Sequence, residues 1–432
     1  MIKPVPIPAE LFVENRRRLV ERLGERALAI VHSNDIMPTN ADGTLGHHQN
    51  ADLFYLSGIG QEESILLLAP NAFDEKLREV LFLREPNEHL LIWEGHKLSK
   101  AEAIQISGVK QIRWLSEFPT VLHQLMCESD SVYLNSNEHP RAVVEVQSRD
   151  ARFIADCQRR FPLHQYRRLA PIMRELRVVK SAAEVAMIRE ACGITRDGFQ
   201  RVLKMVRPGV NETEIEAEFA YEFIRRKGFF AYPPIIAAGA NSCVLHYGQN
   251  DQTCEDGQLV LLDVGCGLNY YMSDMTRTIP VNGRFTPRQR LVYDAVLRTM
   301  RSVIEAMRPG VLVRDLRLLT EKLIEEELLR LGLLTPQMIA QQDPENPALR
   351  KYFMHGVAHS LGIDVHDVSV PGQPVQIGWV LTCEPGIYIR EEGFGIRLEN
   401  DILVTENGPA DLMHDIPVEA DEIEQLMNQG GR

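Results

Sequence analysis

The stretch GQLVLLDVG, residues 257–265, decides the fold, because a second stretch of the same design, GWVLTCEPG, occupies residues 378–386. In each stretch a glycine precedes a β-prone apolar run, an acidic residue ends that run, and another glycine lies two positions beyond the acid. The two acids are Asp263 and Glu384. Short apolar runs bounded by glycines are typical of buried strands. The sequence therefore predicts two equivalent strands, each ending in a carboxylate.

A second repeated signature lies before each of these strands. The tetrapeptide RPGV occurs at residues 207–210 and again at 308–311, each time between two runs of helical periodicity. The earlier run of each pair starts with a capping box, at Ser181 and at Thr286. Two repeated signatures in the same order predict an internal duplication. We therefore expect an α+β C-terminal domain whose two halves are related by a pseudo-twofold axis.

The first third of the chain has a different pattern. Short β-prone runs alternate with helical stretches after an expected helix at 8–25, which is typical of a layered α/β domain. The expected strands are residues 27–32, 64–68, 79–83 and 131–134. Because 432 residues exceed the roughly 250–300 that one core usually supports, we expect two domains, residues 1–168 and 169–432.

Composition restricts the class of partner. The chain has 47 basic and 60 acidic residues, a net charge of −13, and so lacks the basic balance that nucleic-acid binding requires. It contains no apolar run of about 18 residues or more, so we expect no membrane partner either. Its seven cysteines are scattered without a C-x-x-C pair, which favours reduced thiols and a cytoplasmic location over a disulfide framework.

Each predicted strand is followed, beyond an expected turn, by a second acidic residue. The expected turns are residues 265–269 and 388–394, and the acids after them are Asp274 and Glu399. Opposed residues of antiparallel strands have Cβ atoms about 4.5–5.5 Å apart, so both acids of one hairpin can reach one ion. A pseudo-twofold axis would bring the two hairpins together. Because unpaired buried carboxylates are costly, bound cations explain the pattern better than four scattered surface acids.

Histidines supply further polar groups. His355, His359 and His366 lie in one glycine-rich stretch, and His246 follows a β-rich run. Their spacing alone does not separate a metal ligand from proton carriers. Carboxylates with an imidazole form a hard ligand set that suits Mn²⁺ or a similar first-row ion. Two such ions about 3.5–4 Å apart can hold a bridging hydroxide and polarise a carbonyl, so the pattern predicts hydrolytic chemistry. A cysteine nucleophile is disfavoured, because no cysteine has an evident base partner.

Several motifs resemble those of the Xaa-Pro aminopeptidase (aminopeptidase P) family, which belongs to the pita-bread peptidases. They are AYPP at 231–234, NSCVLHY at 241–247, HGVAHSLGIDVH at 355–366, EPGIY at 384–388 and GIRLE at 395–399. Residues 47–58, HHQNADLFYLSG, are similar to a motif of the family's N-terminal domain. The resemblance covers almost the whole chain. It implies a creatinase-like α/β N-terminal domain followed by a pita-bread catalytic domain.

The resemblance also implies roles for individual residues. The implied ligands of two divalent ions are Asp263, Asp274, His359, Glu384 and Glu399. Asp274 and Glu399 would contact both ions, which are expected to be Mn²⁺, with Co²⁺ or Zn²⁺ as alternatives. The implied catalytic and substrate-binding histidines are His246, His355 and His366. Tyr388 matches a substrate-pocket position, and Arg397 would support the ligands.

The implied substrates are peptides with proline at the second position. A hydroxide between the ions would attack the Xaa-Pro carbonyl, and Glu384 would accept the proton of the attacking water. His366 or His355 would stabilise the intermediate. A prolidase, which cleaves Xaa-Pro dipeptides with the same centre, is the alternative. A catalytically silent pita-bread module is disfavoured, because all five implied ligands are present.

The family further implies a homodimer or homotetramer in which a neighbour's N-terminal domain helps to close the pocket. Residues 92–95, which include Trp93, are similar to such a contributing loop. Two regions depart from the family pattern. In the first, residues 37–46 resemble an insertion and His48 stands where the family has an arginine, which concerns the part of the pocket that a neighbouring subunit would complete. In the second, the loop between Glu384 and Glu399 is short, which would open the site.

Overall fold

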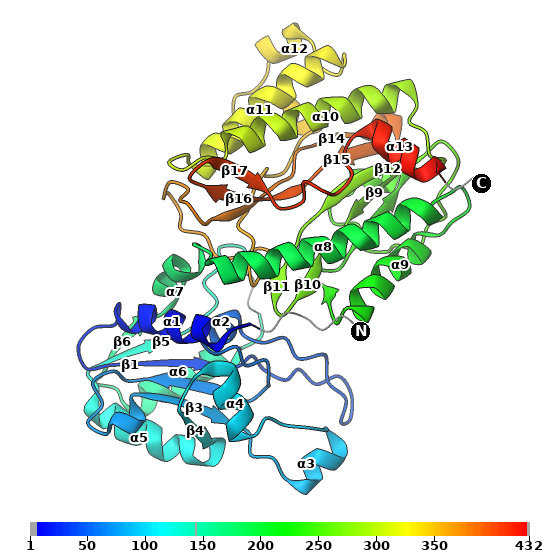
Figure 1. Ribbon diagram of the computed structural model, residues 1–432. Coiled ribbons are helices and arrows are strands. Elements are labelled where there is room, and N and C mark those ends of the chain that lie inside the picture. Colours follow the sequence, from blue (N-terminus) through cyan, green and yellow to red (C-terminus); the bar gives the residue numbers. More distant parts are fainter. Residues whose placement is uncertain (1–6, 143–144, 430–432) are drawn as a thin grey trace. The chain divides into compact units, whose positions relative to one another are not determined.

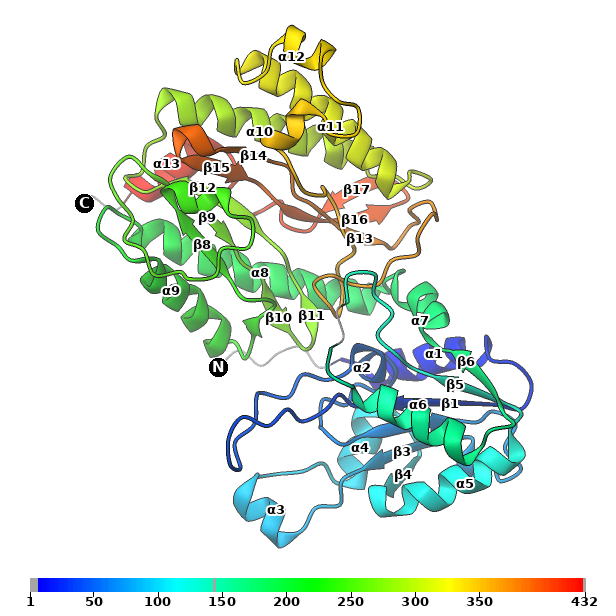
Figure 2. The same cartoon turned by 180° about the vertical axis from the view of Figure 1, so that it is seen from behind.

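The computed structural model describes residues 7–142 and 145–429, which form two compact units (Figures 1 and 2). The first unit ends at Arg177, whereas the sequence predicts a boundary at residue 168. The boundary lies later because helix α7 (Ala170–Arg177) packs against α1 (Ala9–Val20) within the first unit. Arg177 also donates a hydrogen bond of 2.8 Å to Asp52 of that unit.

A six-stranded mixed sheet forms the first unit, in the order β4-β3-β2-β1-β5-β6. Its strands are β1 (Ala27–His32), β2 (Ile65–Leu68), β3 (Glu79–Leu83), β4 (Gln111–Trp114), β5 (Ser131–Leu134) and β6 (Gln165–Arg168). The four predicted strands are confirmed as β1, β2, β3 and β5. The edge strands β4 and β6 were not predicted, because they bury few side chains and so carry a weak apolar pattern.

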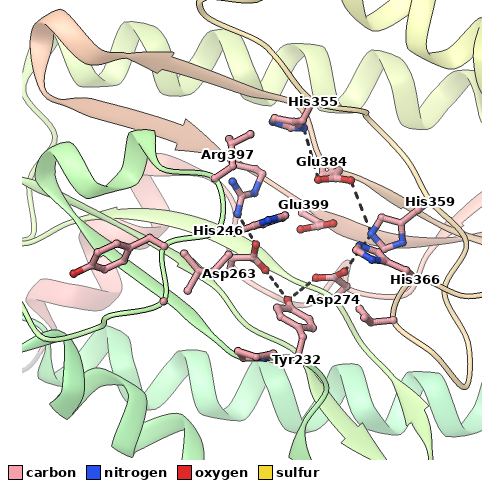
Figure 3. A pocket seen from close by; sticks show the side chains of 16 residues that line it. Tyr232, His246, Asp263, Asp274, His355, His359, His366, Glu384, Arg397 and Glu399 are labelled. Carbon is pink, nitrogen blue, oxygen red and sulfur yellow. Dashed lines mark hydrogen bonds and ion pairs between the residues drawn. The ribbon is translucent and has the colours of Figure 1, made fainter. Parts of the chain in front are cut away.

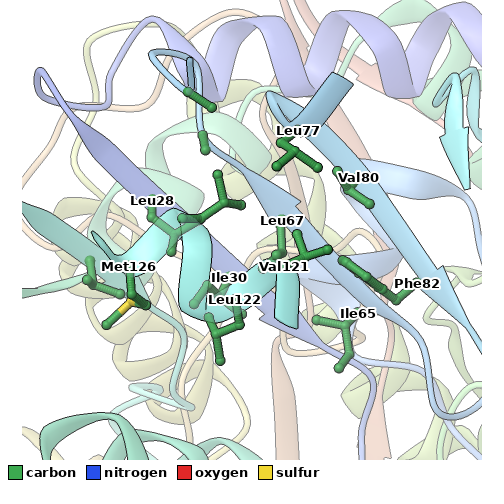
Figure 4. Packing of buried hydrophobic residues seen from close by; sticks show 14 of the residues in the cluster. Leu28, Ile30, Ile65, Leu67, Leu77, Val80, Phe82, Val121, Leu122 and Met126 are labelled. Atoms are coloured by element: carbon green, nitrogen blue, oxygen red, sulfur yellow. The ribbon is translucent and has the colours of Figure 1, made fainter. Parts of the chain in front are cut away.

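The core of the first unit lies between this sheet and helix α5 (Phe118–Glu128). Leu28, Ile30 and Leu67 of the sheet pack with Val121 and Leu122 of the helix, and all five are buried (Figure 4). The other helices of the unit are α2 (Ala51–Ser57), α3 (Glu88–Trp93), α4 (Lys100–Ser107) and α6 (Arg149–Arg160). The predicted layered α/β architecture is confirmed, although α1 is shorter than the expected helix at 8–25.

Two pairs of long helices belong to the second unit. They are α8 (Ala182–Met205) with α9 (Glu212–Arg225), and α10 (Pro287–Ala306) with α11 (Val313–Arg330). Both predicted capping boxes are present, at Ser181 before α8 and at Thr286 before α10. Each RPGV tetrapeptide joins the two helices of a pair. Its glycine has a positive φ, 93° at Gly209 and 94° at Gly310, which glycine adopts without strain.

Each half of the second unit also contains two nested strand pairs. In the first half, β9 (Leu259–Asp263) pairs with β12 (Thr276–Pro280) around the inner hairpin of β10 (Cys266–Leu268) and β11 (Tyr271–Met272). In the second half, β13 (Val380–Cys383) pairs with β16 (Asn400–Thr405) around the inner hairpin of β14 (Gly386–Ile389) and β15 (Phe394–Arg397). This common nesting confirms the predicted internal repeat. The unit also contains β7 (Phe229–Phe230), β8 (Ile235–Ala238), β17 (Gly408–Asp411), α12 (Pro336–Ala340) and α13 (Ala420–Asn428).

The predicted turns are wrong in extent. Residues 266–268 form strand β10, and the chain reverses at Asn269 and Tyr270, whose φ angles are 49° and 63°. The second turn is also shorter than predicted, because β14 continues to Ile389. Each half therefore has two ladders in place of one hairpin. The chain passes from the outer to the inner ladder at Gly265, where a Cβ atom would lie 1.8 Å from the Ser273 carbonyl oxygen.

The sequence predicts no membrane-spanning helix, because it lacks an apolar run of about 18 residues or more. No helix within residues 7–142 and 145–429 combines the length and the apolar character that a membrane crossing needs.

Replacement of Gly265 by alanine should destabilise the second unit. The added methyl group forces the backbone of Ser273 to move, at a cost of about 1–3 kcal/mol in the free energy of unfolding. Gly193 is the matched control, because it lies inside α8 with open space at its Cβ position. Gly193→Ala should raise the free energy of unfolding by about 0.5–1 kcal/mol. The midpoint of urea-induced unfolding measures the stability of each variant. Equal midpoints for the two variants would contradict the close approach of Gly265 to the Ser273 carbonyl oxygen.

Candidate metal centre

Four carboxylates lie where the outer and inner ladders of each half meet. Asp263 ends β9 and Asp274 lies between β11 and β12, whereas Glu384 follows β13 and Glu399 follows β15. Figure 3 shows all four acids together, and they line one cavity of about 320 Å³.

The geometry of these acids suits a divalent cation. Asp274, His359 and Glu399 offer ligand atoms that all lie within 4.8 Å of one another. Glu384 Oε1 lies 3.9 Å from His359 Nε2, so it reaches the same group. Asp263 is linked to Asp274 by the Tyr232 hydroxyl, which lies 2.6 Å from Asp263 Oδ1 and 2.5 Å from Asp274 Oδ1. All five predicted ligands therefore surround one space, and four carboxylates with one imidazole are a hard donor set.

Burial and crowding favour the protonated form of these acids. Burial raises the pKa of Glu384 to about 7 and raises the pKa of Asp263. Burial and the charge of Asp274 raise the pKa of Glu399 still further above its usual range. Burial would lower the pKa of His359, but its hydrogen bond to Asp274 and the charge of Glu384 raise it to about 9. These shifts are the expected result of crowding anions in a site shielded from water.

Arg397 of β15 connects the two halves of the centre. Its guanidinium donates to Asp263, and its Nη1 donates to the Tyr388 hydroxyl at 2.9 Å. Its Nε donates to Thr276 Oγ1 at 3.1 Å, and that hydroxyl donates to Glu399 Oε2 at 2.7 Å. One buried cation thus orients an acid of the first half directly and an acid of the second half through Thr276.

His355 is a neutral imidazole with both ring nitrogens engaged. Its Nδ1 lies 2.6 Å from the Gly356 carbonyl oxygen, which can only accept, so Nδ1 carries the hydrogen. Its Nε2, 2.8 Å from the Tyr388 hydroxyl, therefore accepts a hydrogen bond. Burial and the nearby charge of Arg397 lower the pKa of His355 to about 3.

The other predicted pocket residues differ in their position. His246 and His366 line the cavity, and the ring of His366 packs edge-on against His359 at 4.5 Å between centroids. Tyr388 does not belong to the cavity lining, although a pocket position was predicted for it. It is fully buried behind the cavity, because its hydroxyl is held between Arg397 and His355.

Two residues of the centre were not predicted. Tyr232 lies in the AYPP motif, but nothing in that motif indicates that its hydroxyl links two acids. Asp401 is fully buried, and its Oδ2 accepts a hydrogen bond of 3.0 Å from the Asp274 amide. Its place two residues after Glu399, on the same face of a strand, was an available signal. Thr276 and Asp401 each follow the second acid of their own half by two residues, and each contacts the second acid of the other half.

Comparisons with known proteins identify the family. Residues 186–406 match metallopeptidase family M24, and residues 12–133 match the aminopeptidase P N-terminal domain. The Xaa-Pro aminopeptidase of Escherichia coli strain K12 is 34% identical, and the match covers 98% of each chain. This chain belongs to metallopeptidase family M24. The resemblance to the Xaa-Pro aminopeptidases that the sequence motifs indicate is confirmed.

Solved structures agree with this assignment. Aminopeptidase PepP of Pseudomonas aeruginosa has a TM-score of 0.89 at 31% identity, covering 98% of this M24 chain and 99% of that chain. Zn-substituted E. coli aminopeptidase P in complex with product has a TM-score of 0.87 at 34% identity, covering 99% and 100%. The predicted creatinase-like and pita-bread domains are therefore confirmed, and so is the expected class of hydrolytic metalloenzyme.

Metal uptake by the metal-free M24 protein should release protons near pH 7. Protonated Glu384, Glu399 and His359, whose pKa values are all raised, must lose their protons before they can bind a cation. The affinity for Mn²⁺ should therefore increase from about pH 6 to about pH 8. Calorimetric titrations in buffers of different ionisation enthalpy measure the released protons. Uptake without proton release, at an affinity independent of pH, would contradict the assigned protonation states.

Proposed function

We propose that this chain is an Xaa-Pro aminopeptidase, which removes the first residue of peptides whose second residue is proline. The observation that carries the proposal is the complete set of four carboxylates and one imidazole around a single cavity. It occurs in a chain that matches an Xaa-Pro aminopeptidase over nearly its whole length. Family members that only bind partners would not need this acidic cavity intact.

In this proposal two divalent ions are held by Asp263, Asp274, His359, Glu384 and Glu399. Asp274 and Glu399 would contact both ions. The hard donor set favours Mn²⁺, with Co²⁺ and Zn²⁺ as alternatives. When bound, such ions lower the pKa of water and polarise a carbonyl group.

The protein's own side chains would carry the proton transfers. Glu384 suits the role of proton acceptor, because its carboxylate lines the cavity beside His359, where water held by the ions would lie. His355 has no free N–H for an oxyanion, since its Nδ1–H is donated to Gly356, so we assign stabilisation of the intermediate to His366. His355 instead holds Tyr388, and through it Arg397, in place. His246, exposed at the cavity, would contact the substrate.

The acids also explain why cleavage would stop after one residue. A peptide's free α-amine is a cation, which the carboxylate-lined end of the cavity attracts. The proline nitrogen has no N–H in the peptide and must gain a proton to leave. The apolar part of the lining, formed by Ile235, Leu245 and Val365, suits a proline ring.

Assembly and location stay predictions. We propose a homodimer or homotetramer in the cytoplasm. The contributing loop that the resemblance implies includes Trp93, which is 73% exposed, and Ile92, which is 76% exposed, and such exposure suits burial by a second subunit. In the insertion-like loop 37–46, Pro38 and Thr44 form an antiparallel bridge. We propose no partner beyond peptides and further copies of the chain.

Replacing a ligand and a non-ligand should separate metal binding from catalysis. Asp274→Ala should lose both bound metal and activity, because an acid proposed to contact both ions is removed. His366→Ala should keep its metal but lose about 10²–10⁴-fold in kcat. Asp294→Ala is the control, since Asp294 pairs with Arg290 on the surface of α10. Metal analysis and assays with Mn²⁺ provide the readouts, and wild-type turnover by Asp274→Ala would refute the centre.

A panel of peptides should decide between the proposed activity and the prolidase alternative. Xaa-Pro-Yaa tripeptides and longer Xaa-Pro peptides should be cleaved after the first residue, and chelation should abolish the activity until Mn²⁺ is restored. The same panel with Co²⁺ and Zn²⁺ identifies the preferred ion. Cleavage of Xaa-Pro dipeptides alone would assign the chain as a prolidase instead.

A further inference from the structure

Arg277 of β12 is a completely buried arginine whose partners are all neutral. It donates five hydrogen bonds, and none of the acceptors is a carboxylate. The acceptors are the carbonyl oxygens of Thr276 at 2.9 Å, Glu399 at 2.8 Å, Pro417 at 2.8 Å and Ile416 at 3.4 Å, with Asn400 Oδ1 at 2.8 Å. A buried cation without a paired anion is rare because of its desolvation cost. The position of Arg277 therefore requires an explanation.

Two of these five hydrogen bonds, which together form a cage around the guanidinium, lie at the junction between the halves. Arg277 Nη1 donates to the carbonyls of both Thr276 and Glu399. These two residues form an isolated antiparallel bridge, in which the Glu399 amide donates to the Thr276 carbonyl at 3.0 Å. Arg277 thus reinforces the backbone contact between Glu399, a proposed ligand of both ions, and Thr276 of the opposite half.

Nearby polar groups act against the cost of burying this cation. Burial lowers the pKa of Arg277, and Tyr293 and the carboxyl groups of Asp411, Glu399 and Asp401 act in the opposite direction. An arginine retains its proton in such a setting. The corresponding position of the second half is the buried apolar residue Ile402, which also follows the second acid of its half by three residues. The second half therefore has no arginine at this position, and the guanidinium of Arg277 contacts backbone carbonyls of both halves.

We propose that Arg277 is a positioning residue for the metal centre, which holds the Glu399 backbone against Thr276 through its hydrogen bonds. The inference rests on the proposed role of Glu399 as a metal ligand. Its effect is on metal affinity, because loss of an outer hydrogen-bonding partner of a ligand typically weakens metal binding about 10–100-fold.

Arg277→Lys tests the hydrogen bonds while retaining the positive charge. The variant should bind Mn²⁺ at least about tenfold more weakly than the wild type in calorimetric titration of the folded, metal-free protein. Arg16→Lys is the control, because Arg16 is equally buried in the first unit, where it donates to the carbonyls of Leu56 and Ser107 and also pairs with Glu79. It should lower the thermal midpoint but leave the Mn²⁺ affinity within about twofold of the wild type.

Folded Arg277→Lys with wild-type Mn²⁺ affinity would overturn the proposal. If that variant does not fold, Asn400→Ala removes one acceptor of the cage and should still weaken Mn²⁺ binding by at least about twofold. Unchanged affinity in Asn400→Ala would then overturn it. Wild-type protein that takes up no divalent ion would refute the metal centre itself, and this distinguishes the failure of the proposed function from the failure of the Arg277 inference alone.

Discussion

Repulsion between carboxylates that are held together away from water is the constraint on which the second unit depends. The nested ladders bring Asp263, Asp274, Glu384 and Glu399 to one cavity, and their negative charge must be offset within the protein. Protons on the acids, the guanidinium of Arg397 and the hydroxyls of Tyr232 and Thr276 provide that compensation in the absence of ions. The same arrangement creates the affinity for cations, because a cation replaces several weak compensating contacts with direct charge neutralisation.

Much of the fold could be predicted because its strongest signals are local. The capping boxes at Ser181 and Thr286 and the two RPGV joints fixed the helix pairs. Glycine-bounded apolar runs located β9 and β13 with an acid at or directly after the end of each. The inner hairpin of the first half was missed, because β11 has only two residues, Tyr271–Met272, too few to show any alternation.

The contacts within the site could be predicted only in part. The ligand set was found because its members repeat at matching places in the sequence. Tyr232 and Asp401 were missed, since their contacts with Asp274 span 42 and 127 positions and exist only after the ladders have formed. For Tyr388 the sequence left a pocket position and a packing role open, because its partners His355 and Arg397 lie on different segments.

The reciprocal contacts of Thr276 and Asp401 have a consequence for this architecture. Each half contributes one of the two central acids and also the residue that supports the acid of the other half. The two central acids therefore depend on each other across the pseudo-twofold axis, and neither half alone contains a complete site. The halves are not identical, because Arg277 belongs to the first and His359 and Arg397 belong to the second, so the two sides of the centre differ.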